Sequence, residues 1–249
     1  MIRNKIYLIP NMLTIGSLFC GFLSLIYIFN NNFYQAAILI IVATFLDSLD
    51  GRIARITKTT SEFGAQLDSL SDIVTSGLAP AVLLYSWFLN EVDIFNYSLI
   101  NLGLIISFIY LSSVALRLAR FNSSSKSDFF IGLPCPVPAA FFSLFFILFE
   151  SINIDIIFYI NEASLVVLLL SFLMISKFSY LSFKSVGSSE KIKFYWLFVF
   201  IVLFTLIMIN PLLVASFLIS VYILSGPVVF IIRHLSKIIF NKQKSESKQ

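Results

Sequence analysis

The stretch "DSLDGRIARI", residues 47–56, places two aspartates and two arginines directly after a long apolar run. The residues before it, "YQAAILIIVATFL", are mostly apolar. Charged side chains are costly in hydrocarbon, and those that persist in membrane helices usually serve a function. The stretch therefore predicts a membrane helix with a functional group of charges at one end.

The composition supports a membrane protein. Of the 249 residues, 59% are hydrophobic and 12% are charged, roughly half the charged share of an average soluble domain. Apolar runs recur along the chain, and several approach the roughly 20 residues that span a bilayer. The N-terminus has the basic start of a signal peptide but no clear cleavage site, and further apolar runs follow it at once. We expect a retained first helix within an all-α, polytopic transmembrane bundle.

Apolar periodicity predicts about eight helices, near residues 13–29, 33–56, 62–89, 98–120, 137–156, 162–178, 194–209 and 212–233. All 17 Lys and Arg residues fall at one end of these helices, and the loops at the other end carry only acidic charges. The positive-inside rule then places both termini and the arginine-bearing loops on the cytoplasmic side, and we expect the membrane to be the inner one. We expect one membrane domain (1–233) and a polar cytoplasmic tail (234–249), disordered at its end. The net charge of +4 indicates the orientation of the chain in the membrane and contact with anionic lipid headgroups, and we expect no nucleic-acid partner.

The opening stretch continues into a longer pattern that ends at Asp72. On the first helix, Asp47, Asp50 and Gly51 lie at spacings i, i+3 and i+4, which puts them on one face. On the next helix, Asp68 and Asp72 are one turn apart and also share a face. Because a short turn joins the two helices antiparallel, four carboxylates can converge near the cytoplasmic surface.

Four carboxylates in one place imply bound cations. Like charges so close would otherwise force protonation, and an all-oxygen site suits Mg²⁺, Mn²⁺ or Ca²⁺ rather than zinc. Two cations held by carboxylates are a recurrent means of neutralising a diphosphate and stabilising attack at phosphorus. An isolated D-x-x-D-G would more simply mark a helix end. The complete pattern, however, arises by chance only on the order of 10⁻¹⁰ per starting point.

The complete pattern, D-x2-D-G-x2-A-R-x8-G-x3-D-x3-D, matches the signature of the CDP-alcohol phosphotransferases, and the chain resembles this family over nearly its whole length. Further stretches resemble the CDP-diacylglycerol–serine O-phosphatidyltransferase branch: "IPNMLTIGSLFCGF" (9–22), "LDSLSDIVTSGLAPA" (67–81), "ALRLARFN" (115–122), "FIGLPCPVPAA" (130–140), "SKFSYLSFKS" (176–185) and "YILSGP" (222–227). The family transfers a phosphatidyl or similar group from a CDP-linked donor to an alcohol and releases CMP. The resemblance therefore implies that CDP-diacylglycerol and L-serine are converted to phosphatidylserine.

The resemblance also implies roles for the matching residues. A two-metal site for Mg²⁺ or Mn²⁺ is expected at Asp47, Asp50, Asp68 and Asp72. Asp72 is expected to be the general base as well as a ligand of the second metal. Contacts to CDP-diacylglycerol are expected from Asn11, Thr14, Gly51, Arg55 and Ser61. Family members also form homodimers, so a dimer is an expectation for this chain.

Two arginines near the end of the fourth expected helix leave alternatives open. Arg117 and Arg120 either hold the serine carboxylate or the donor phosphate, or anchor the helix under the positive-inside rule. The prolines of "GLPCPVP" fix the chain direction at the start of the fifth helix, which favours a structural role. Lys184 faces either lipid phosphate, which we favour, or the site.

Two other functions are compatible with parts of the pattern. The same donor could serve another acceptor, glycerol 3-phosphate or an inositol phosphate, although a phosphorylated acceptor calls for more basic residues in its pocket. A cation transporter would also place carboxylates among membrane helices. The acidic residues lie at the end of two adjacent helices beside arginines, and the sequence has no sign of the inverted repeats of many transporters. The enzyme is therefore the favoured interpretation.

Overall fold

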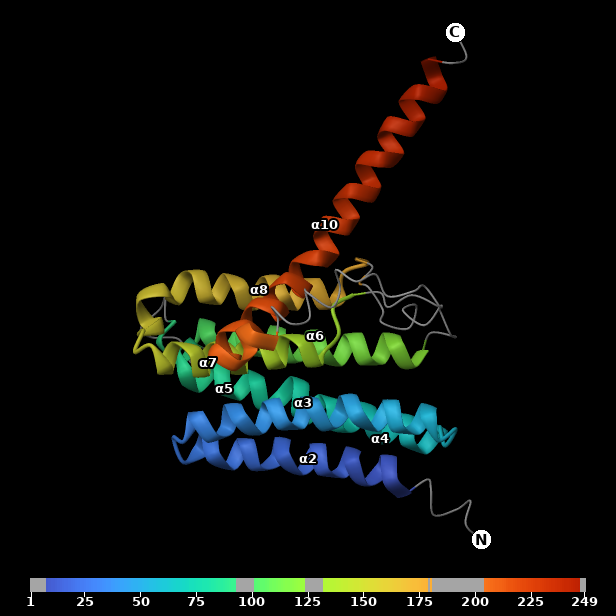
Figure 1. Cartoon of the computed structure of the whole chain (residues 1–249). Coiled ribbons are helices and arrows are strands. Elements are labelled where there is room, and N and C mark those ends of the chain that lie inside the picture. Colours follow the sequence, from blue (N-terminus) through green and yellow to red (C-terminus); the bar gives the residue numbers. More distant parts are fainter. Residues whose placement is uncertain (1–7, 93–100, 124–131, 179, 181–203, 247–249) are drawn as a thin grey trace. The chain divides into compact units, whose positions relative to one another are not determined.

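The computed structural model describes residues 8–92, 101–123, 132–178, 180 and 204–246, and its regular elements in these ranges are all helices (Figure 1). The elements in chain order are α2 (Leu8–Phe29), α3 (Phe33–Ile56), α4 (Glu62–Asp72), η1 (Ile73–Leu78), α5 (Ala79–Trp87), η2 (Leu89–Glu91), α6 (Leu102–Ser123), α7 (Pro136–Ser151), η3 (Ile156–Tyr159), α8 (Ile160–Ile175) and α10 (Pro211–Glu246). The predicted all-α class is confirmed.

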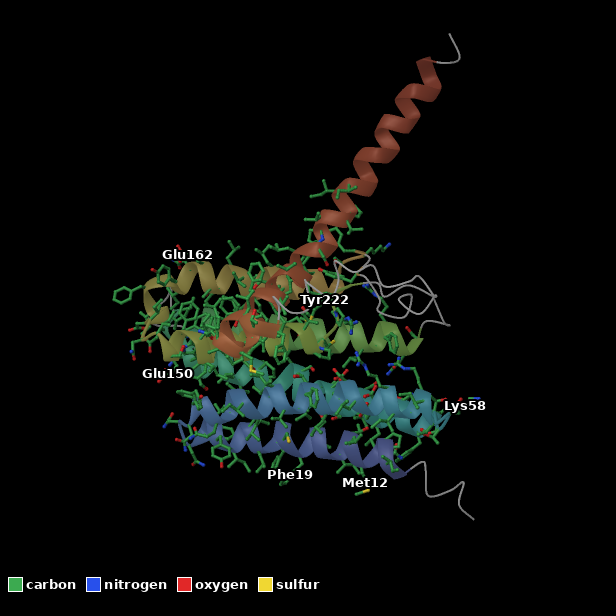
Figure 2. The ribbon with its side chains drawn as sticks, viewed as in Figure 1. Met12, Phe19, Lys58, Glu150, Glu162 and Tyr222 are labelled. Carbon is green, nitrogen blue, oxygen red and sulfur yellow. The ribbon has the colours of Figure 1, made fainter. Side chains whose placement is uncertain are left out.

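Five of the described segments are long and apolar enough to cross a membrane. They are Ile9–Phe29, Glu62–Trp87, Leu102–Ser123, Ile156–Ile175 and Pro211–Ile232. Large apolar side chains point outward from these segments, and Figure 2 shows this for Met12 and Phe19, whose exposed fractions are 68% and 56%. Such exposure is costly in water but not in lipid, so the chain is a multi-pass membrane protein.

Most helix boundaries differ from the sequence prediction by only a few residues. The first described helix starts at Leu8 rather than near residue 13, and Pro10 is tolerated in its first turn, where the backbone N–H groups have no partner within the helix. In the helix predicted at 194–209, residues 194–203 lie outside the described part of the chain, as does Lys184. The prediction of disorder in the tail "NKQKSESKQ" (241–249) was wrong for residues 241–246, because α10 continues to Glu246, and residues 247–249 lie outside the described part of the chain. The polar end of α10 is rich in Lys, Gln and Glu, which propagate a helix that has already formed.

The chain divides into two compact units, one of residues 1–125 and 134–175, the other of residues 126–133 and 176–249. In the second unit, the Tyr180 hydroxyl donates a hydrogen bond to the Ile223 carbonyl over 3.3 Å. Its ring fills the space beside Gly226, where a Cβ atom would approach the ring to 2.3 Å. A glycine at this position therefore lets an aromatic ring pack directly on the α10 backbone.

The first unit is built on the pairing of α2 with α3. A three-residue turn, Asn30–Asn32, reverses the chain between them, and Asn31 takes the left-handed φ of 59° that asparagine tolerates. The Ser17 hydroxyl donates to the Ala43 carbonyl over 2.9 Å across the pair. Small side chains on α3, including Ala43, are completely buried. Small residues and short hydroxyl bonds allow membrane helices to approach closely.

The segment Glu62–Trp87 is one continuous span with a π-helical insertion, η1, in its middle. The insertion begins immediately after Asp72, the last residue of α4. The Tyr110 hydroxyl of α6 donates to the Ser76 carbonyl over 2.8 Å, and a Cβ atom at Gly21 of α2 would come within 2.8 Å of the Thr75 side chain. The insertion is thus fixed from two sides, as is common for π segments at functional sites.

Candidate functional site

Two consecutive helices present the acidic residues of the pattern. Asp47 and Asp50 lie one turn apart near the end of α3, and Asp68 projects from α4 after the turn at residues 57–61. The turn closes with Ser61 as the N-cap of α4, whose hydroxyl accepts a hydrogen bond from the Gly64 N–H over 3.0 Å. This cap fixes the start of α4 and thereby the direction of its acidic face.

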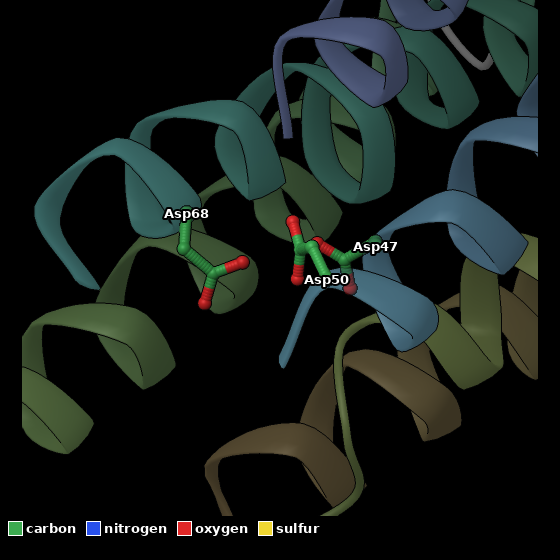
Figure 3. A group of neighbouring side chains, drawn as sticks. All are labelled: Asp47, Asp50 and Asp68. Atoms are coloured by element: carbon green, nitrogen blue, oxygen red, sulfur yellow. The ribbon is translucent and has the colours of Figure 1, made fainter. Parts of the chain in front are cut away.

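Three of the carboxylates converge on one point. Asp47, Asp50 and Asp68 each offer an oxygen atom, and these atoms lie within 4.8 Å of one another (Figure 3). Asp72, one turn beyond Asp68, lies close enough to interact electrostatically with Asp47 and Asp68. The four aspartates that the sequence singles out are therefore brought together, three in a tight cluster and the fourth beside it.

Neighbouring hydroxyl groups orient two of the buried carboxylates. The Thr14 hydroxyl of α2 donates to Asp50 Oδ2 over 2.5 Å, and Asp50 is only 4% exposed. The Ser76 hydroxyl, in the π segment, donates to Asp72 Oδ1 over 3.5 Å. The Asp50 carboxylate therefore has a fixed orientation before any ligand binds, whereas the long bond to Asp72 is weak.

The acidic cluster fits a hard divalent cation. The Asp47 Oδ1 atom is buried and has no hydrogen-bond partner among the residues that the structure describes. A buried carboxylate oxygen without a partner is costly, and so is the close approach of several like charges. A cation such as Mg²⁺ or Mn²⁺ removes both costs, because it accepts carboxylate oxygens as ligands. The donor set of three carboxylates therefore matches the expected metal chemistry.

Arg117 lies beside the fourth carboxylate. It is half-buried on α6 and interacts electrostatically with Asp72. Its Nη1 donates to the Cys135 sulfur over 3.2 Å. Its Nε is buried and has no partner in the described part of the chain, so one edge of the guanidinium remains able to bind an anion.

Arg120 has a different environment. It is exposed, and its Nη1 donates to the Ile175 carbonyl over 2.8 Å. Ile175 is the last residue of α8, where unpaired carbonyl groups favour a cation. The two arginines that the sequence could not separate are thus distinguished by their surroundings, with Arg117 at the acidic site and Arg120 at a helix end.

The residues expected to contact a nucleotide lie around the α3–α4 turn and the start of α2. A Cβ atom built on Gly64 would lie 3.1 Å from the Ser61 hydroxyl oxygen and 3.3 Å from Asn11 Oδ1, so these two polar side chains are neighbours. A Cβ atom at Gly51 would meet nothing within 4 Å, which leaves open space beside that backbone. Arg55 is exposed in the last turn of α3.

Sequence reasoning missed two side chains at the site. Ser76 had no recognisable signal, because a π insertion is not visible in an apolar stretch such as "IVTSGL". Cys135 lies within the "GLPCPVP" motif, which was interpreted through its prolines alone. The bond from Thr14 to Asp50 was also unforeseen, since Thr14 was expected to face a ligand rather than a carboxylate of the chain.

Comparison with known proteins gives consistent matches. Residues 7–162 match the family model described as CDP-alcohol phosphatidyltransferase. A "CDP-diacylglycerol--serine O-phosphatidyltransferase" of Helicobacter pylori is 35% identical, with 97% of this chain and 98% of that protein covered. Proteins with the same name from Methanocaldococcus jannaschii (38% identical, 71% of this chain and 75% of that protein) and Bacillus subtilis (39% identical, 51% and 69%) are also similar.

Proposed function

Because the chain belongs to the CDP-alcohol phosphatidyltransferase family, we propose that it transfers the phosphatidyl group of CDP-diacylglycerol to L-serine. The products are phosphatidylserine and CMP. The observation that carries this proposal is the convergence of Asp47, Asp50 and Asp68 within 4.8 Å, with Asp72 beside them. The names of the similar proteins support serine as the acceptor.

The carboxylates of Asp47, Asp50 and Asp68 would hold a divalent cation, Mg²⁺ or Mn²⁺, and Asp72 would contribute to a second. Bound there, such cations would neutralise the charge of a diphosphate and of the leaving phosphate. The unpaired oxygen of Asp47 and the fixed orientation of Asp50 support this ligand set. Preorganised ligands avoid the reorganisation that would otherwise weaken binding.

Asp72 acts as the general base. The serine hydroxyl oxygen attacks the phosphorus that carries diacylglycerol, and Asp72 accepts the hydroxyl proton. The bond between that phosphorus and the bridging oxygen breaks, and CMP leaves with the electron pair. The position of Asp72 beside the cluster supports this role, because a base must reach the acceptor without being enclosed by the other carboxylates.

The donor nucleotide occupies the region around the α3–α4 turn. Asn11 and Ser61 are adjacent polar groups there, and the open side of Gly51 allows a ligand to approach the backbone. Arg55 is exposed and able to bridge phosphate oxygens. Thr14 acts mainly through Asp50, to which its hydroxyl is already bonded.

Arg117 binds the carboxylate of the acceptor serine. Its unpartnered Nε and its place beside Asp72 support this role, because the base and the acceptor must meet. A guanidinium edge pairs with a carboxylate through two parallel hydrogen bonds. Arg120, bonded to the end of α8, stabilises the bundle instead.

The site faces the cytoplasm, at the inner (cytoplasmic) membrane. Figure 2 shows Lys58 at one end of the first unit and Glu150 and Glu162 at the other. Lys58 belongs to the α3–α4 turn, close along the chain to the acidic cluster. Under the positive-inside rule this end is cytoplasmic, where serine and CMP are exchanged with solution.

The test is an acceptor assay with the purified full-length protein in mixed micelles. Labelled serine, CDP-diacylglycerol and Mn²⁺ or Mg²⁺ are expected to give labelled phosphatidylserine, and EDTA is expected to abolish it. Glycerol 3-phosphate and inositol phosphate are supplied in parallel reactions. Labelled lipid from glycerol 3-phosphate alone would overturn the serine assignment, and no lipid product from any acceptor would overturn the transferase.

A further inference from the structure

The guanidinium of Arg117 has an uncommon partner, the thiol of Cys135. The Nη1 of Arg117 donates to the sulfur over 3.2 Å, and Cys135 is completely buried. Arg117 lies on α6, whereas Cys135 directly precedes α7. The contact therefore joins α6 to the start of α7, next to the arginine that interacts with Asp72.

A thiol supports the arginine without neutralising it. Burial raises the pKa of Cys135 to about 11, so the sulfur carries no negative charge at neutral pH. Sulfur is a weak hydrogen-bond acceptor, whereas a carboxylate at the same place would form an ion pair with the guanidinium. The thiol therefore adds no second negative charge to that of Asp72, with which Arg117 already interacts.

The backbone around Cys135 is stiff. Pro134 and Pro136 flank the cysteine, and each fixes its own φ angle. The Val137 N–H donates to the Pro134 carbonyl over 3.1 Å, which closes a turn around the cysteine. Pro136 is also the first residue of α7, where a proline is well tolerated. The sulfur is thus held at a fixed point at the start of α7.

We propose that Cys135 is a positioning residue for Arg117: it directs the guanidinium toward the acceptor while leaving its charge and its Nε edge free for the acceptor carboxylate. This inference rests on the proposed function, because it needs Arg117 to bind the acceptor. The Nε that remains unpaired in the described structure is the group that the acceptor then satisfies. In the motif "GLPCPVP", the prolines set the course of the backbone, whereas Cys135 contributes to binding of the acceptor.

The test compares Cys135→Ala, Cys135→Ser and Arg117→Gln with the double variant that combines Cys135→Ala and Arg117→Gln. Full-length protein in mixed micelles is assayed over a range of serine and, separately, of CDP-diacylglycerol. We expect Cys135→Ala to raise the KM for serine about two- to tenfold, the effect of one lost hydrogen bond of ordinary strength, because sulfur is a weak acceptor. The KM for CDP-diacylglycerol is expected to stay unchanged. Cys135→Ser, which keeps an acceptor atom, is expected to restore the serine KM.

The double variant decides whether the cysteine acts through the arginine. If it does, Cys135→Ala has no further effect on the serine KM once Arg117→Gln is present. Cys20→Ala is the matched control, because Cys20 is a half-buried free cysteine on a different helix, α2. Its kinetics are expected to equal those of the wild type.

Three results would overturn the inference. They are an unchanged serine KM in Cys135→Ala, an equal loss of affinity for both substrates, and a full additional effect of Cys135→Ala in the Arg117→Gln background. Thermal unfolding of each variant shows whether a loss is one of folding, and Cys135→Ser, with its similar size, keeps the test valid if the alanine variant is unstable. Wild-type protein that does not use serine refutes the proposed function instead, so the two failures are distinguishable.

Discussion

Replacement of Asp72 by asparagine tests whether the proposed general base acts separately from the proposed metal ligands. The asparagine side chain has nearly the same shape, and its carbonyl oxygen still accepts the hydrogen bond from Ser76 that Asp72 receives over 3.5 Å. Asp72 is buried, with an exposed fraction of 8%. The substitution also removes one negative charge from a site that holds three other carboxylates. The variant is therefore expected to fold normally and to lose chiefly the ability to take up a proton.

The expected loss follows from the role. Removal of a general base typically lowers the rate by about 10²–10⁴-fold, and loss of a ligand for a second cation adds to this. Binding of CDP-diacylglycerol is expected to fall only modestly, because the cluster of Asp47, Asp50 and Asp68 remains complete. Asp50→Asn, by contrast, is expected to lose donor binding together with turnover.

The assay measures turnover and the dissociation constant for CDP-diacylglycerol in Mn²⁺-containing detergent solution for both variants. Ser76→Ala is the matched control, since it removes only a long and weak hydrogen bond to Asp72. Its turnover is expected to remain within about threefold of the wild type. Equal loss of donor binding in Asp72→Asn and Asp50→Asn would refute the distinction, and Asp72 would then be chiefly another metal ligand.

Further substitutions test the rest of the site. Asp47→Asn and Asp68→Asn are each expected to weaken Mn²⁺ binding, measured by titration calorimetry, and to abolish turnover, and near-normal turnover of both at saturating Mn²⁺ would contradict the ligand set. Gly51→Ala is expected to lower donor affinity and to keep the thermal unfolding midpoint, because a Cβ at Gly51 meets nothing within 4 Å. Gly21→Leu is expected to lower the midpoint, because a Cβ at Gly21 would lie 2.8 Å from the Thr75 side chain. Arg120→Ala is expected to lower the midpoint without changing the serine KM, which kinetics and thermal unfolding check together. Since burial raises the pKa of Cys135 to about 11, its reactive thiolate is scarce below that pH, and mass spectrometry is expected to find it unalkylated at pH 8 in the folded protein.

The helices were predictable because their signal is local. Apolar runs such as the one before Asp47 must form helices in lipid, where each backbone polar group needs an internal partner. Most boundaries are therefore displaced by only a few residues. The error at the end of α10 has the same local origin, since a polar composition was interpreted as disorder although its residues readily continue a helix to Glu246.

The sequence by itself determined the chemistry of the candidate site. The spacing of Asp47, Asp50, Asp68 and Asp72 fixes which residues share a helix face, because helical periodicity depends only on separation along the chain. Carboxylates at this density call for a cation whatever the details of packing. The family resemblance then supplied the expected reaction.

Only the tertiary structure decided which side chains from distant parts of the chain support those carboxylates. Thr14 reaches Asp50 from α2, and Cys135 reaches Arg117 from the start of α7. Arg117 and Arg120 have the same residue type and nearly the same sequence position, yet one lies beside Asp72 and the other binds the end of α8. Three residues correspond to about 300° of rotation around a helix, and neighbouring helices determine what each side meets. Those neighbours are set by packing between helices, which no local pattern encodes.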